Sequence, residues 1–204
     1  GLLVNLELAR AVMPCCEQIR GPVEELVSGD VPLESVPARI IDAFRAEWRR
    51  VRGGLPLTTI AIADDDPSNQ YLYPEFLLYQ RLFEQAGLQA LVVDAAALEI
   101  NGDRLTAAGT PLDLVYNRVT DFYFRDDRHV ALREAFERGL AVITPNPASH
   151  AHWADKRLLA WLRDETLLRA AGLDDADRAH LLQSIPPTEI VAADAAADLW
   201  RRRK

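Results

Sequence analysis

The stretch "LTTIAIADDDPSNQYLYPEFLLYQRLFEQAGLQALVVDA", residues 57–95, decides the fold. It begins with an apolar run rich in β-branched residues (57–63), passes through a turn with three aspartates and a proline, and continues as a helical pattern over about 74–87 before a second apolar run at 89–94. Apolar strands that alternate with helices are typical of parallel βαβ units, whose strands are buried on both faces. The stretch therefore predicts one strand–helix–strand unit of an α/β protein.

The same alternation continues along the chain. Two further apolar runs, at 112–117 and 140–144, are separated by a helical pattern over about 129–139. We therefore predict an α/β fold with a Rossmann-like open parallel sheet of about four strands and helices on both faces. Asn101-Gly102 lies between strand-like flanks, which predicts a small hairpin with a type I′ turn inserted into this alternation.

Helical patterns occupy both ends of the chain. Two N-terminal segments, at about 3–20 and 35–52, carry apolar residues at helical spacing. They contain too few apolar residues for a core of their own, so Phe44 and Trp48 are expected to pack on the α/β body or on a partner. Further helices are predicted at about 149–163 and 175–184.

The composition is that of an ordinary soluble globular protein, with 204 residues, 49% hydrophobic and 26% charged. The formal charge of -8 is spread along the sequence and gives no support for a nucleic-acid partner. The first apolar run contains Asn5, Glu7 and Arg10 and has no basic segment before it, which argues against a signal peptide or a membrane span. Cys15 and Cys16 are adjacent, so a disulfide between them would be strained. We therefore expect both thiols to stay reduced and the cysteines to serve as packing residues in a cytoplasmic protein.

Polar side chains gather where three of the predicted strands end, at 64–71, 117–121 and 144–147. In an open α/β sheet, ligands bind outside these carboxyl ends. The three aspartates at 64–66 could hold Mg²⁺, accept hydrogen bonds from the following amides in a turn or helix cap, or contact a ligand. Tyr71 and Tyr73 could face a ligand or cover the core.

Arg118 follows an apolar strand, where its guanidinium could bind a carboxylate or a phosphate through two hydrogen bonds. The alternative is a structural ion pair with Asp121 or Asp126. Farther along, His150 and His152 form an H-x-H pair, but positions i and i+2 diverge on a helix, which disfavours a zinc site. The phosphate-loop, dinucleotide and nucleophile-elbow motifs are all missing from the sequence.

Two stretches resemble a known family. "VITPNPASHAHWADKRLLAWL" followed by "IPPTEIV" resembles the segment that leads from the pre-ATP-grasp domain into the ATP-grasp domain of carboxylate–amine ligases. The stretch 65–105, with "LDLVYNRVTDFYF" behind it, is similar to the circularly permuted, glutathionylspermidine-synthase-like branch of that superfamily. The resemblance covers roughly residues 57–191. The matching positions of the first motif are Asn146, Asp155, Lys156, Leu159 and Pro187-Thr188.

This resemblance implies a substrate-side, pre-ATP-grasp domain. In the parent ligase, ATP would form an acyl phosphate that an amine attacks, with Mg²⁺ as the second cofactor. Asn117 and Arg118 would orient the substrate carboxylate. The expected partners are a small-molecule acid or amine and the remainder of the ATP-grasp chain, without nucleic acid or membrane. Further polar contacts would come from Asn69, Gln70, Tyr71 and Asn146.

The sequence also departs from the family. The strand lysine, the glycine-rich flap and the Mg²⁺-binding carboxylates of ATP-grasp enzymes do not occur in it. We therefore expect a fragment that is inactive alone and holds no cofactor, with a helical segment at 1–54, the Rossmann-like domain at 55–191 and the start of a missing domain at 192–204. Two other functions stay open, namely a non-catalytic α/β interaction module docked through its N-terminal helices, and an independent small-molecule transferase.

Overall fold

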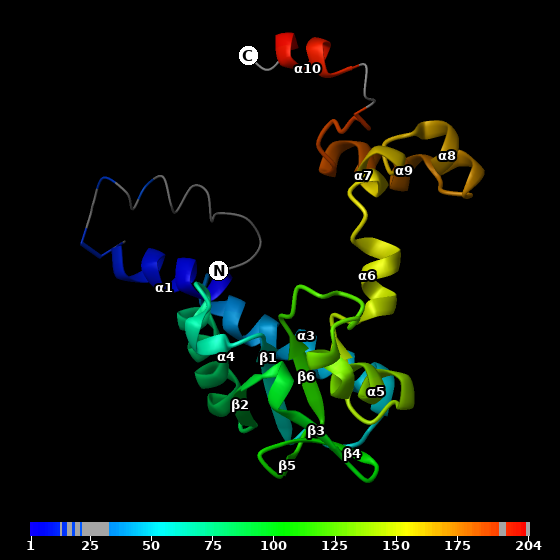
Figure 1. Cartoon of the computed structure of the whole chain (residues 1–204). Coiled ribbons are helices and arrows are strands. Elements are labelled where there is room, and N and C mark those ends of the chain that lie inside the picture. Colours follow the sequence, from blue (N-terminus) through cyan, green and yellow to red (C-terminus); the bar gives the residue numbers. More distant parts are fainter. Residues whose placement is uncertain (13, 16–17, 19–20, 22–32, 192–194, 203–204) are drawn as a thin grey trace. The chain divides into compact units, whose positions relative to one another are not determined.

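The computed structural model describes the chain except for residues 13, 16–17, 19–20, 22–32, 192–194 and 203–204 (Figure 1). The described residues form two compact units, within residues 1–147 and residues 148–204.

The first unit is built on a four-stranded parallel sheet in the order β2 (Gln89–Asp94), β1 (Thr59–Asp64), β6 (Leu114–Asn117), β7 (Val142–Thr144). All four predicted strands are present within two residues of their expected positions. The chain steps from β1 outward to β2 and then returns to the other side of β1 to form β6. The strand order therefore reverses between β1 and β6, and the carboxyl ends of these two strands form the topological switch point.

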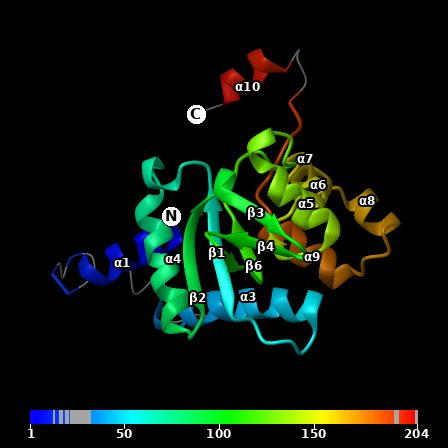
Figure 2. The ribbon, with the colours of Figure 1, turned by 60° about the horizontal axis from the view of Figure 1, so that its bottom comes forward.

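Helices cover both faces of the sheet, as predicted. One face carries α1 (Leu2–Val12), α3 (Val36–Arg52) and α4 (Tyr73–Gln85), whereas the other carries α5 (Val130–Arg138). Figure 2 shows α4 and α5 on opposite sides of the strands. Side chains of β1 alternate between the two layers, so that Ile60 and Ile62 enter the core under α4 while Ala61 and Ala63 face α5.

The N-terminal helices belong to this first unit. Leu3 of α1 and Trp48 of α3 are buried in the same core as the α4 face of the sheet, and Phe44 packs against it. The buried carboxylate of Glu75, at the start of α4, accepts hydrogen bonds from the amides of Leu3 and Val4, at 2.9 and 2.8 Å. The prediction that these helices pack on the α/β body is therefore confirmed.

The antiparallel insert differs in detail from its prediction. Strands β3 (Leu98–Asn101) and β4 (Arg104–Ala107) form the expected hairpin, and β5 (Thr110–Pro111) extends it. Asn101 pairs with Arg104, so the two-residue loop is Gly102-Asp103, one position later than the Asn-Gly signal suggests. Only Gly102 of that pair has a positive φ, at 63°, so the type I′ turn was wrong, since it needs two such residues.

Boundaries also shift at the two ends of the chain. Helix α1 ends at Val12, and much of the remainder of the helix predicted to reach residue 20 lies outside the described residues. The side chain of Cys15 is exposed and does not pack in a core. Cys16 lies outside the described residues. Gly53, with φ 64°, caps α3 and ends it at Arg52, the predicted boundary of this segment.

The second unit consists of short helices, α6 (Pro147–Trp153), α7 (Arg157–Trp161), α8 (Glu165–Ala170), α9 (Asp175–Ser184) and α10 (Ala196–Arg202). The continuous helix predicted at 149–163 is broken into α6 and α7, whereas α9 has its predicted bounds. The guanidinium of Arg163 donates to the carbonyl oxygens of Leu182, at 2.7 Å, and Ile185, and so joins the segment after α7 to the end of α9.

Candidate functional site

The polar loop after β1 is a strand-to-helix turn stabilised largely by its own side chains. The carboxylate of Asp64 accepts from the amide of Asp65 at 2.9 Å, and Asp66 accepts from the side-chain amide of Asn69 at 2.7 Å. Asp66 has φ 43°, a left-handed conformation that aspartate tolerates better than most residues, and a single 3₁₀ turn, Pro67–Asn69, follows it. The side chains of Asp64 and Asp66 therefore act as turn acceptors.

The next two predicted site residues lie at the outer part of this loop. Gln70 donates its side-chain amide to the carbonyl of Asp65 at 2.7 Å, which closes the turn. Tyr71 is 95% exposed and therefore does not cover the core, whereas Tyr73 is partly buried against it. Of Gln70, Tyr71 and Tyr73, Tyr71 has the side chain most accessible to a ligand.

Asn117, at the end of β6, is buried and bound within the protein. Its side-chain oxygen accepts from the amide of Val119 at 3.1 Å, and its side-chain nitrogen donates to the carbonyl of Pro145 at 3.1 Å. Asn117 thereby ties the loop after β6 to the turn after β7. Asn146 likewise donates to a carbonyl near its own strand, that of Ile143, at 3.3 Å.

Arg118 lies on the opposite face of the sheet from Asn117, toward α4, and its side chain is half-buried. Its Nη1 donates to the hydroxyl of Tyr116 at 3.2 Å. Its Cζ lies 5.5 Å from the ring centroid of Tyr116 and 6.0 Å from that of Phe76, so that two aromatic rings support the guanidinium.

The alternative role for Arg118, a structural ion pair, is not found. Asp121 is bound to His129, and Asp126 is bound to Arg128. Among the residues that the structure describes, no carboxylate forms an ion pair with Arg118. The guanidinium therefore retains N–H groups that can bind an anion.

Asp64 lies at the adjacent position on β1. Ala63 pairs with Asn117 in the sheet register, and the Arg118 amide donates to the Ala63 carbonyl at 2.8 Å. Asp64 and Arg118 are therefore the next pair of neighbouring residues, and both lie on the face toward α4. Partial burial raises the pKa of the Asp64 carboxyl, and the hydrogen bond from the Asp65 amide only partly offsets this rise. A carboxyl and a guanidinium thus stand side by side at the switch point.

His129 is a buried residue that sequence reasoning missed. Its side chain is 1% exposed, with Nε2 2.7 Å from Asp65 Oδ1 and Nδ1 3.0 Å from Asp121 Oδ2. Burial alone would lower the pKa of this imidazole, but the two carboxylates outweigh burial and raise it. When protonated, the ring donates to both carboxylates and joins the loops after β1 and β6. The sequence around His129 gives little indication of this role, because its partners Asp65 and Asp121 lie 64 and 8 residues away along the chain.

This geometry restricts the chemistry available at the switch point. Both ring nitrogens of His129 are hydrogen-bonded, so its imidazole cannot act as a base or nucleophile toward a substrate without losing its bond to Asp65 or Asp121. Within the described part of the chain, no group of three or more His, Cys, Asp or Glu side chains is placed to hold a metal ion. The arrangement is suited to bind and orient an anionic or doubly charged small molecule.

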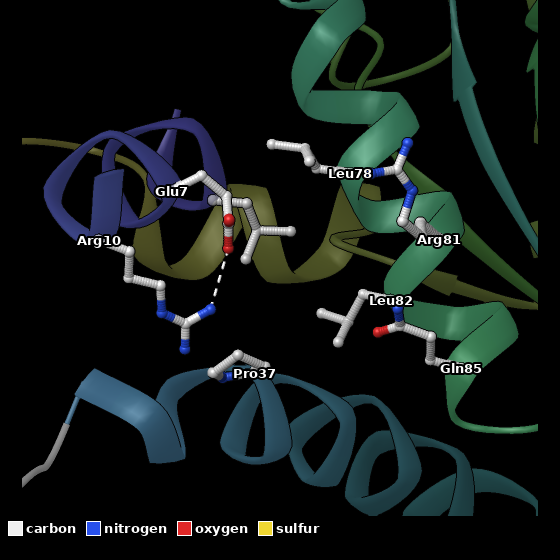
Figure 3. A pocket seen from close by; sticks show the side chains of 8 residues that line it. Glu7, Arg10, Pro37, Leu78, Arg81, Leu82 and Gln85 are labelled. Atoms are coloured by element: carbon white, nitrogen blue, oxygen red, sulfur yellow. Dashed lines mark hydrogen bonds and ion pairs between the residues drawn. The ribbon is translucent and has the colours of Figure 1, made fainter. Parts of the chain in front are cut away.

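Two surface hollows lie away from this edge. One, of about 270 Å³, is formed by α1, α3 and α4, and Figure 3 shows Glu7 and Arg10 of α1 paired across its wall opposite Arg81 of α4. The other, of about 440 Å³, lies near the amino ends of the strands and includes Asp113. Asp113 accepts from the amides of both Thr58 and Thr59, at 2.9 and 3.0 Å, which is a structural role.

Comparison of the sequence with protein-family models gives no match, and comparison with curated proteins gives no significant match. In the described residues, no helix combines the length and apolar character that crossing a bilayer requires.

Proposed function

We propose that this chain is the substrate-side, Rossmann-like domain of an ATP-dependent carboxylate–amine ligase, as the family resemblance of its sequence implies. The observation that carries the proposal is the half-buried guanidinium of Arg118, which lies at the switch point of the sheet without a carboxylate partner among the described residues. Keeping a charged group partly buried and unpaired is costly, which favours a site whose partner is a ligand.

The proposed role of the chain is to hold the acid substrate. Arg118 would bind the carboxylate through two parallel hydrogen bonds, and the rings of Tyr116 and Phe76 fix the plane of the guanidinium before the ligand arrives. ATP would supply the activation that converts a carboxylate into an acylating group. In the proposed ligase, ATP and Mg²⁺ would be held by the strand lysine, the glycine-rich flap and the carboxylates of an ATP-grasp domain, which this sequence does not contain.

The two alternative functions make different demands on the chain. A transferase would bind its nucleotide or other donor within these residues. An interaction module docked through the N-terminal helices would use the apolar side chains that stay exposed on them, such as Leu2 and Leu8 of α1, because Leu3, Leu6, Ile41 and Trp48 are buried in the sheet core. The proposed ligase domain needs neither feature.

The test uses the product of the complete coding sequence that contains this chain. We expect release of ADP that depends on Mg²⁺, an acid and an amine, and we expect Arg118→Ala to lower kcat/KM by about 10- to 100-fold, the scale of a lost charge-assisted hydrogen bond. Arg118→Lys should restore little of this loss, since an ammonium lacks the planar fork. Arg125→Ala serves as the matched control, because Arg125 also lies over a ring, 5.2 Å from the centroid of Tyr123, but is exposed.

Calorimetry on the chain itself separates the alternatives. The proposed domain should bind ATP weakly or not at all, whereas tight nucleotide binding would favour the transferase. Unchanged kinetics in Arg118→Ala would assign Arg118 a structural role and contradict the proposal.

A further inference from the structure

The pairing of opposite charges at the switch point indicates the class of ligand. Asp64 and Arg118 stand at the same level on neighbouring strands and on the same face of the sheet. Neighbouring strands lie about 4.8 Å apart, so the two side chains begin close together. Even so, no ion pair joins them in the described structure. The guanidinium of Arg118 instead donates to the Tyr116 hydroxyl and lies over the rings of Tyr116 and Phe76.

Both groups retain free binding capacity. Asp64 accepts one hydrogen bond, from the Asp65 amide to Oδ1, and Arg118 donates one side-chain hydrogen bond, to Tyr116. In the register of the sheet, Asp94 on β2 lies beside Asp64 on the side away from Arg118. The ends of β1 and β2 therefore carry carboxyl groups and the end of β6 carries a guanidinium. Arg128 adds positive charge beside Asp65, 3.8 Å from its carboxylate, and also interacts with Asp94.

We propose that Asp64 and Arg118 bind the α-ammonium and the α-carboxylate, respectively, of an amino acid. This inference rests on the proposed function and specifies its substrate class. A simple carboxylate would be attracted by Arg118 but repelled by Asp64, whereas a simple protonated amine would be attracted by Asp64 but repelled by Arg118. A zwitterion, whose two charges are separated by one carbon atom, complements both groups at once.

The partial burial of Asp64 strengthens this preference. A carboxylate that has lost part of its hydration gains more from a nearby cation than an exposed one does. Arg118 and His129 already act to lower the pKa of Asp64 without reversing its rise, and the ammonium of the ligand adds a further cation, so binding should lower this pKa from the raised value of the free protein.

The test is a side-chain NMR titration of the whole chain with glycine, acetate and methylammonium as separate probes. We expect glycine to shift the signals of both Asp64 and Arg118 and to bind at least about 10-fold more tightly than either single-charge probe. Asp64→Asn should weaken glycine binding by about 10-fold or more and make glycine and acetate bind alike. Asp103→Asn, at the exposed tip of the β3–β4 hairpin, is the matched control and should change neither affinity.

Two results would overturn the inference. If acetate binds as tightly as glycine and Asp64→Asn has no effect, the site binds simple acids; the ligase proposal then stands and only the amino-acid specificity fails. If glycine shifts neither residue, the zwitterion site does not exist, and the ADP-release assay decides the ligase proposal separately. The backbone amide spectrum of each variant verifies that it is folded.

Discussion

The two faces of the sheet differ at the switch point, although the residues involved are neighbours in sequence. On the face toward α5, the side chains of Asp65, Asn117 and His129 are all bound within the protein. On the face toward α4, Asp64 and Arg118 keep groups that can still bind a ligand. Side chains alternate across a strand, so a step of one residue separates a structural polar group from a candidate binding group.

Burial explains why the two faces differ. His129 is 1% exposed, and a buried polar group without partners would cost stability, so its bonds must be completed within the protein. Arg118 is half-buried and supported by rings, so solvent or a ligand can complete its hydrogen bonds. The comparison predicts that variants on the α5 face change stability and variants on the α4 face change binding.

The largest effect is expected for His129→Ala. Removing the imidazole leaves Asp65 and Asp121 without their shared cation and opens a cavity, so the free energy of unfolding of the first unit should fall by about 2–4 kcal/mol. Native-state hydrogen exchange of amides in β1 and β6 measures this unit alone, which matters because the chain has two units.

His180→Ala is the matched control for that variant. His180 is exposed on α9, so its loss should change stability by less than about 0.5 kcal/mol. Equal exchange protection in His129→Ala and the wild type would show that the Asp65–His129–Asp121 bridge adds nothing to stability, and the distinction between the two faces would then fail.

Asn117→Ala should have the next largest effect. It removes the acceptor for the Val119 amide and the donor to the Pro145 carbonyl, and should lower the free energy of unfolding by about 1–3 kcal/mol. Glycine affinity, measured by the same NMR titration, should stay within about twofold of the wild type at temperatures where the variant is folded. A large loss of affinity with unchanged stability would place Asn117 among the ligand-binding residues.

Deprotonation of His129 at high pH should destabilise the first unit less than removal of its side chain does. A neutral imidazole can still donate one of its two hydrogen bonds to Asp65 or Asp121. The pKa of His129 is raised in the folded state, so its contribution is complete below the unfolded pKa and is lost as pH rises through the folded pKa. For Asp121, burial acts to raise the pKa, but hydrogen bonds from the Asp126 amide and His129 lower it overall, so its contribution is lost as pH falls through the folded pKa.

The bridge should therefore stabilise most between about pH 4 and pH 6.5, the ordinary values of the two groups. The measurement is the difference in sheet-amide protection between wild type and His129→Gln across pH 4–9. This difference should shrink toward alkaline pH, and a difference that grows with pH would contradict a protonated, bridging His129.

Much of the fold could be predicted from local patterns. The strands were visible because apolar runs such as the one at 59–64 stand between turn residues and amphipathic helices. The hairpin turn was misplaced by one residue because Gly102 can occupy either central position of a tight turn. The broken helix at 147–161 was missed because its apolar spacing continues through the break.

The site was only partly predictable, for two physical reasons. A strand buried on both faces reads as a continuous apolar run, so the sequence shows no alternation that would assign Asn117 and Arg118 to different faces. The contact of His129 with Asp65 spans 64 residues and depends on the paths of two loops. Arg118 was found because its position after a strand follows from chain order alone.

Of the alanine variants at the switch point, Arg118→Ala should lose the least stability. The substitution removes one hydrogen bond to Tyr116 and the contact with two rings, worth about 0.5–1 kcal/mol at a partly exposed site. It breaks no ion pair, and the Tyr116 hydroxyl keeps a neighbour because the Tyr79 hydroxyl lies beside it and the rings are 5.0 Å apart. The free energy of unfolding should therefore fall by less than about 1 kcal/mol in the hydrogen-exchange measurement. Arg118→Lys should be closer still to the wild type, since the aliphatic stem continues to cover Phe76. A loss as large as that of His129→Ala would show that Arg118 stabilises the fold as strongly as the buried histidine does, and the contrast between the two faces would no longer separate binding residues from structural ones.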